Sequence, residues 1–100
     1  MTREPNVIYI GRKPTMSYVL AMMTSFTGSS AEEVTLKARG QAITTAIDAA
    51  EIVRHRFMKE LNVSKITIGT EEMPPREGEN RTRNVSTIEI TLSKETKPRE

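Results

Sequence analysis

Apolar and polar positions in the N-terminal part of the chain predict a strand, a helix and a second strand. Val7–Ile10 is apolar at every position, which is typical of a strand covered on both faces, as in a parallel sheet. From Pro14 to about Phe26, apolar residues recur at the spacing of an amphipathic helix, with proline in its first turn. Glu33–Ala38 alternates between polar and apolar side chains and predicts a half-buried strand, which Gly40 ends.

The longest periodic segment extends from Gln41 to about Leu61 and predicts a second helix. Its apolar residues cover an arc of roughly 160°, which is wider than a surface helix needs for packing on its own core. Two explanations remain open from the sequence. The helix is either sunk into a small domain or shared with a partner subunit.

Two further strands are predicted over Ser64–Thr70 and Val85–Ser93, each with branched apolar residues on one face. The connection between them, Glu71–Arg83, contains two prolines and the turn signal Gly78. It exceeds the usual hairpin link of about two to five residues, and long connections in small domains are often functional or disordered. Residues 94–100 are polar and are expected to form a frayed tail.

This order of elements predicts an α/β fold of the α+β two-layer kind. We expect a βαβαββ sandwich in which a four-stranded mixed sheet carries two helices on one face. Residues 1–93 are expected to form a single domain. A strand–helix–strand unit normally joins parallel strands through a right-handed crossover. The first two strands should therefore end at the same edge of the sheet, where ligands of open α/β sheets bind.

Basic residues follow both of these strands, immediately before a helix. Arg12 and Lys13 come after Gly11, and Lys37 and Arg39 frame the end of the second strand. Cations are unfavourable beside the positive end of a helix dipole. Four of them at one edge would repel each other unless an anion lay there, and backbone N–H groups with Arg and Lys side chains suit phosphate. The alternative is a pair of ordinary solvated turns.

Composition excludes several classes of function without identifying one. Fifteen Lys and Arg against thirteen Asp and Glu give a net charge of +2, too small to indicate a nucleic-acid binder by itself. Cysteine and Gly-rich nucleotide loops are absent from the sequence, and we expect neither a metal nor a cofactor. No apolar run approaches the roughly 20 residues of a membrane span, so we expect a cytoplasmic protein without a membrane partner.

Catalysis has little support in the sequence. His55 follows Glu51 by four residues inside the long predicted helix, which is an ordinary helix-face pair. No nucleophile or metalloprotease signature is present in the sequence. We expect no enzymatic activity, and a small enzyme that acts on a phosphate ligand is kept as an alternative.

The long connection offers a second candidate region. Arg76, Arg81 and Arg83 would reach a duplex groove if the connection were an extended arm, as arginines do in narrow minor grooves. Four glutamates against these three arginines leave Glu71–Arg83 with a net charge of −1. A mobile, solvated hairpin tip is therefore the alternative.

Three segments of the chain resemble the Alba family of archaeal chromatin proteins. They are GRKPTMSYVLA, KARGQAITTAIDAAEIVRHRF and NVSTIEI, in this order and spacing, and the resemblance extends over about residues 6–93. It implies a dimeric, non-enzymatic binder of double-stranded DNA and of RNA, associated with the chromosome. The implied fold is similar to the C-terminal domain of a bacterial translation initiation factor. The implied partners also include a paralogue in a heterodimer and higher assemblies on DNA.

The resemblance also implies roles for particular residues. Those implied to contact nucleic acid from the two turns are Gly11, Arg12, Lys13, Lys37, Arg39, Gly40 and Gln41. The hairpin arms of the dimer are implied to follow the minor groove through Arg76, Arg81 and Arg83. Arg56 and Phe57 are implied to form contacts between neighbouring dimers, although Phe57 would also suit the core. Lysine acetylation is associated with the family, and in the first turn only Lys13 can carry it.

This sequence departs from the family pattern at two positions that are often basic, Gln41 and Thr45. Together with the acidic arm, this predicts weaker or more salt-sensitive binding than in a strongly basic relative. The expected function is sequence-nonspecific binding of duplex DNA, of RNA, or of both, through phosphate contacts. The alternatives are an RNA-specific subunit of a ribonucleoprotein and a purely structural oligomerisation module.

Overall fold

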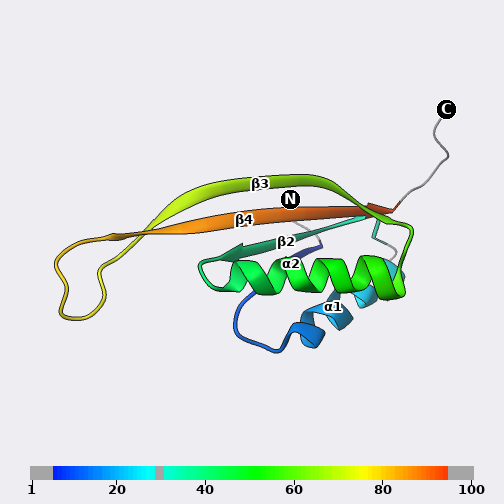
Figure 1. The fold of residues 1–100 in the computed structure, drawn as a ribbon, viewed down its shortest axis with the longest axis horizontal. Coiled ribbons are helices and arrows are strands. Elements are labelled where there is room, and N and C mark those ends of the chain that lie inside the picture. The colour runs from blue at the N-terminus through cyan, green and yellow to red at the C-terminus, as the bar shows by residue number, and fades with distance from the viewer. Residues whose placement is uncertain (1–5, 29–30, 95–100) are drawn as a thin grey trace.

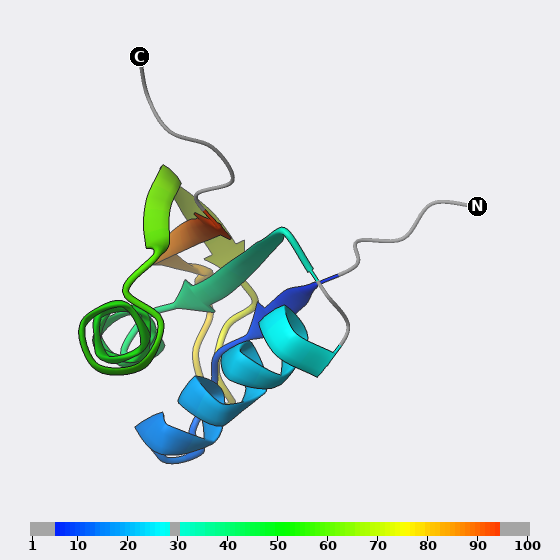
Figure 2. The ribbon, with the colours of Figure 1, turned by 90° about the vertical axis from the view of Figure 1, so that its right-hand side faces the viewer.

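A sheet of four strands carries two helices on one of its faces, as the computed structural model shows for residues 6–28 and 31–94 (Figures 1 and 2). The predicted two-layer α+β architecture is confirmed. In chain order the elements are β1 (Val7–Tyr9), α1 (Thr15–Gly28), β2 (Glu33–Arg39), α2 (Ala42–Ile52), the π-helical turn η1 (Val53–Phe57), β3 (Leu61–Met73) and β4 (Arg83–Lys94).

The strands are arranged in the order β1-β2-β4-β3. β1 and β2 are parallel, and Tyr9 lies opposite Lys37. This confirms the parallel pair that the crossover predicts. β4 is antiparallel to both of its neighbours, and the last residue of β2, Arg39, lies opposite Thr87.

The core lies between the helices and the inner face of the sheet. α1 packs on β1 and β2, and α2 packs on β2 and β4. Fully buried side chains come from every layer, including Met22 and Phe26 of α1, Leu36 of β2, and Leu92 of β4. Along β2 and β4, apolar and polar residues alternate, so the polar side chains lie on the outer face of the sheet, opposite the core. That outer face carries no helix in either view (Figure 2).

The prediction that the first strand is covered on both faces is wrong. β1 is an edge strand, and Tyr9 is 70% exposed. The apolar run Val7–Ile10 gave no sign of this, because a tyrosine suits a strand surface as well as a strand interior.

The second helix ends earlier than predicted. The α-helical part ends at Ile52 and is followed directly by η1, which ends at Phe57. The Met58 N–H donates to the Val53 carbonyl at 2.7 Å, and Leu61, predicted as the last helical residue, is the first residue of β3. Part of its broad apolar arc, including Ala46 and Val53, is buried in the chain's own core, but Ile47 is 43% exposed. Packing in the chain's own core therefore explains part of the arc, and sharing with a partner subunit stays a prediction.

The last two strands are longer than predicted and form an arm. Beyond the pair Arg39–Thr87, β3 and β4 continue to pair with each other as far as Met73 and Arg83. We call residues 70–86 the arm; it extends past the end of β2 and gives the molecule its length of 54 Å (Figure 1).

β4 extends one residue beyond the predicted domain end. The Lys94 Nζ donates a hydrogen bond to the Phe26 carbonyl at 3.1 Å. The rest of the predicted tail, residues 95–100, lies outside the described residues. Within residues 6–28 and 31–94, neither helix combines the length and hydrophobicity needed to span a membrane.

Candidate nucleic-acid interface

The loop between β1 and α1 is held by the phenol of Tyr18. Its oxygen accepts hydrogen bonds from the backbone N–H groups of Gly11, at 2.8 Å, and Lys13, at 3.0 Å. Tyr18 is buried, so the packing of α1 on the core also holds the loop in place through these two hydrogen bonds. The side chains of Arg12 and Lys13 remain exposed. The loop therefore presents two cations on a backbone whose shape is set by the core.

The second turn depends on the conformation of Gly40. Its φ of 59° lies in the left-handed region that favours glycine. Its N–H donates to the Ser86 carbonyl at 2.9 Å, and its carbonyl accepts from the Ile43 N–H at 3.1 Å. These bonds connect the end of β2 with β4 and with the start of α2. Arg39 and Gln41, on either side of the glycine, are exposed.

The parallel register brings the two turns together at one edge of the sheet. The Ile10 N–H donates to the Lys37 carbonyl at 2.9 Å, so the chain leaves β1 and β2 at adjacent points. Neighbouring strands are about 4.8 Å apart. The first turns of α1 and α2, both within the described residues, contain no acidic residue, which leaves the positive ends of both helix dipoles without a carboxylate of their own.

The arm starts from this same edge (Figure 1). Arg76 and Arg81 lie in the connection at its tip, and Arg83 is the first residue of β4. A local bond from the Glu79 N–H to the Arg76 carbonyl, at 2.9 Å, shapes the tip. The Thr82 Oγ1 donates to a carboxylate oxygen of Glu72 at 2.9 Å. The arginines of the arm are therefore mixed with acidic neighbours, as its composition predicted.

Two carboxylates lie beside the cations of β2. The Arg39 Nη1 is 2.7 Å from the Glu71 Oε1 of the arm, and the Lys37 Nζ is 3.8 Å from the Glu89 Oε2 of β4. The prediction that these cations need an external anion is therefore wrong for Lys37 and Arg39. The Arg39–Glu71 pair is exposed and the Lys37–Glu89 pair is partly exposed, so each contributes about 0–1 kcal/mol and a phosphate can compete with the carboxylates.

The residues implied in contacts between dimers lie elsewhere. Arg56 and Phe57 belong to η1, which is separated from the Gln41 turn by the length of α2, about 17 Å at 1.5 Å per residue. Phe57 is 47% exposed and is not a core residue, contrary to the alternative left open by the sequence. Both side chains are accessible and are separated from the second turn by α2, whereas Arg56 lines one depression with Thr15, two residues after Lys13.

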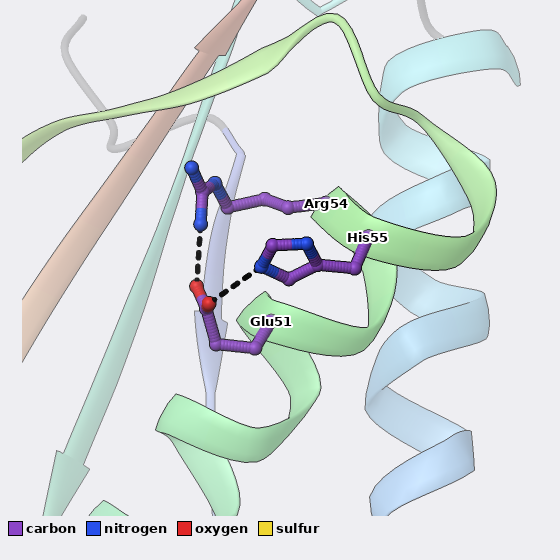
Figure 3. A network of polar contacts seen from close by, with 3 residues as sticks. All are labelled: Glu51, Arg54 and His55. Carbon is purple, nitrogen blue, oxygen red and sulfur yellow. Dashed lines mark hydrogen bonds and ion pairs between the residues drawn. The ribbon is translucent and has the colours of Figure 1, made fainter.

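The predicted pair of Glu51 and His55 is confirmed as part of a small network at the end of α2 (Figure 3). One Glu51 oxygen accepts from the Arg54 Nη1 at 2.7 Å, and the other lies 3.0 Å from the His55 Nε2. The hydrogen bond from Arg54 is the main cause that lowers the pKa of Glu51, with a smaller contribution from His55 and an opposing one from burial. The network connects α2 with η1.

Sequence reasoning missed three residues of this edge. Tyr18 lies seven residues from Gly11, and Glu71 and Glu89 reach their cations only through the strand register. A tyrosine at a buried helical position gives no signal that its hydroxyl caps a loop. The carboxylates would have been found only by predicting the order β2-β4-β3.

The fold and this edge define a small α+β protein in which two basic turns and an extended hairpin arm meet at one end of a mixed sheet. The chain belongs to the Alba family, whose model matches residues 6–70. This confirms the family that the three segments resemble.

Similar proteins cover almost the whole chain. The DNA/RNA-binding protein Alba of Methanocella arvoryzae is 52% identical over 91 residues, which are 91% of this chain and 92% of the relative. The DNA/RNA-binding protein Alba 1 of Archaeoglobus fulgidus is 51% identical over 89% of this chain and 96% of its own length. The solved structure of Alba from Thermoplasma volcanium superposes with a TM-score of 0.81 at 45% identity and covers 89% of this chain and 100% of that one. These names describe binding proteins and not enzymes.

Proposed function

We propose that this protein binds nucleic acid through the phosphate backbone, without sequence preference, and that its ligands are duplex DNA and RNA. One observation carries the proposal: the loop with Arg12 and Lys13, the turn with Arg39, and the base of the arm lie at the same edge of the sheet. Membership in a family whose relatives are named DNA/RNA-binding proteins supports nucleic acid as the ligand class.

Binding would proceed by exchange of carboxylate for phosphate. Arg39 forms an ion pair with Glu71 in the free protein, and a backbone phosphate offers an equivalent pair of anionic acceptor oxygens. Arg12 and Lys13 would add contacts on a loop already fixed by Tyr18. Phosphate contacts position a duplex and carry no sequence information, so affinity would come mainly from counterion release.

The active unit would be a homodimer. Ile66 and Ile68 lie opposite Ile90 and Ile88 and share the helix-bearing face of the sheet, but they are 56% and 77% exposed. α2, on the same face, leaves Ile47 exposed beside the core. Such an apolar strip suits a second copy of the same chain, because a two-fold axis makes one patch complementary to itself. A heterodimer with a paralogue would use the same surface.

In the cell this proposal corresponds to an architectural protein of the chromosome in the cytoplasm. Arg56 and Phe57 would join neighbouring dimers along DNA, since they are accessible and lie at the opposite end of α2 from Gln41. Acetylation of Lys13 would remove one cation from the first turn and weaken phosphate binding. An RNA-specific role in a ribonucleoprotein is the second candidate, since RNA is one of the two ligands in the relatives' names.

The test is the salt dependence of binding to random duplex DNA. With about six phosphate contacts, the slope of log K against log salt concentration should be near −5. Fluorescence anisotropy across a salt series measures this slope. A flat dependence would contradict the electrostatic mechanism, and competition between duplex DNA and structured RNA at one salt concentration ranks the two ligands.

Glu71→Gln should raise the affinity for duplex DNA by roughly two- to fivefold. The amide keeps the shape of the side chain but releases Arg39 from an exposed ion pair worth about 0–1 kcal/mol, and it removes a negative charge next to the bound phosphate. Glu60→Gln is the matched control, because it changes the net charge equally at an exposed position in the turn before β3. Equal gains in both variants would assign the effect to net charge and not to Arg39.

A further inference from the structure

The outer face of the sheet contains a depression that shares Arg39 with the proposed phosphate contacts and extends from it across the other strands. Its volume is about 540 Å³, within the range of about 300–1,000 Å³ that is usual for small-ligand sites. All four strands contribute to its lining, and it begins directly beside the two basic turns: Tyr9 is two residues before Gly11, and Lys37 is two residues before Arg39.

An aromatic ring stands at one side of this depression. Tyr9 is 70% exposed on a face without helices, so the packing of the core does not account for it. The Lys37 Nζ lies 5.9 Å from the centre of the ring, which places a cation next to an aromatic surface. Exposed aromatic side chains on an open sheet are a recurrent platform for stacking single-stranded bases.

The floor of the depression is open because β3 has a glycine there. Gly69 lies opposite Thr87, and a Cβ at this position would come within 3.2 Å of the Thr87 Oγ1. Without that side chain, the Thr87 hydroxyl and the carboxylates of Glu71 and Glu89 line the hollow together. These groups accept hydrogen bonds from base amino groups and from the ribose 2′-hydroxyl, but the two carboxylates repel phosphate.

We infer that this depression binds an unpaired base and its ribose from single-stranded RNA, with the base stacked on Tyr9. Bases inside a duplex have both faces covered by their neighbours, so only an unpaired base can use the ring. Lys37 and Arg39 would hold the flanking phosphates, continuous with the proposed backbone contacts at the two turns. The acceptors at Glu71 and Glu89 favour RNA over DNA, because only RNA supplies the 2′-hydroxyl donor. This inference rests on the proposed function and adds a ligand class to it.

The test compares variants of Tyr9 on three labelled oligonucleotides of one sequence: single-stranded RNA, single-stranded DNA and duplex DNA. Tyr9→Ala should weaken RNA binding about tenfold, the scale of one base–aromatic stack, and leave duplex binding nearly unchanged. Tyr9→Phe keeps the ring and should bind RNA like the original chain. Thr67→Ala, at an exposed position of β3 on the same outer face but outside the depression, is the matched control and should change neither.

A second readout uses fluorescence. The chain contains no tryptophan, so Tyr9→Trp introduces a single one, whose emission should be quenched by single-stranded RNA and not by the duplex. Unchanged RNA affinity in Tyr9→Ala, or quenching by the duplex alone, would overturn the inference. Equal losses on single-stranded RNA and DNA would overturn the assignment to RNA. The Arg12→Ala/Lys13→Ala double variant tests the proposed function separately. If it loses duplex binding, the results above contradict only the inference about Tyr9. If it binds the duplex normally, the proposed function itself is wrong.

Discussion

Replacing both Arg12 and Lys13 by alanine should weaken binding to duplex DNA by about 30- to 800-fold, equally for all base sequences. Each exposed interaction with a phosphate contributes about 0.5–1 kcal/mol, and a dimer would carry two such loops. The log–log salt slope should become shallower by about 0.9 for every phosphate that the variant no longer neutralises. Anisotropy titrations with A·T-rich, G·C-rich and random duplexes measure both effects.

The fold should tolerate this double change. Both side chains are exposed, and the backbone of the loop is held by the Tyr18 hydroxyl through the N–H groups of Gly11 and Lys13, which alanine retains. Lys59→Ala/Lys65→Ala is the matched control, since it removes two exposed cations elsewhere and changes the net charge equally. If the control loses as much affinity as the loop variant, overall charge explains binding and the loop is not the site.

Ile68→Glu should convert the proposed homodimer to a monomer, with a rise in the dimer dissociation constant of at least about 100-fold. Burial of an isoleucine contributes about 1.5–3 kcal/mol, and the two-fold axis would place two glutamates in the exposed apolar patch that Ile68 shares with Ile66. Sedimentation equilibrium or light scattering measures the change in mass.

Leu20→Glu is the matched control for this experiment. Leu20 is 58% exposed on α1, which packs on β1 and β2, so the same apolar-to-acidic change falls far from β3. Circular dichroism should show both variants folded, because neither residue is buried in the single chain. Dimeric mass in Ile68→Glu would place the subunit contact on another surface.

The amino-acid sequence was sufficient for the order of elements and for the edge on which the two turns meet. Both follow from local patterns: the apolar run at β1, the alternation in Glu33–Arg39, and the handedness of the crossover between them. The glycine that reverses the chain after β2 was also predictable, because Gly40 needs a positive φ.

Features that depend on contacts between distant residues were not predictable. The exposure of Tyr9 follows from the position of β1 at the edge of the sheet, and the ion pair of Arg39 with Glu71 follows from the order β2-β4-β3. The end of α2 was misjudged because Leu61 continues the helical spacing by coincidence, while the bond from the Met58 N–H to the Val53 carbonyl already closes the last turn. Periodicity does not distinguish a helix from the strand that follows it when both bury apolar side chains.

The arm has a consequence for how much binding energy its arginines can contribute. Beyond the pair of Arg39 with Thr87, toward the tip of the arm, β2 ends and only β3 and β4 remain paired. A two-stranded ribbon alone is only marginally stable in water. Holding the ribbon in one conformation on a ligand therefore consumes conformational entropy, on the order of 1 kcal/mol for each residue that becomes fixed. Pro74 and Pro75, directly after the end of β3, reduce this loss because their φ angles are restricted before any ligand arrives. The arm is thus partly preorganised by two residues that carry no charge.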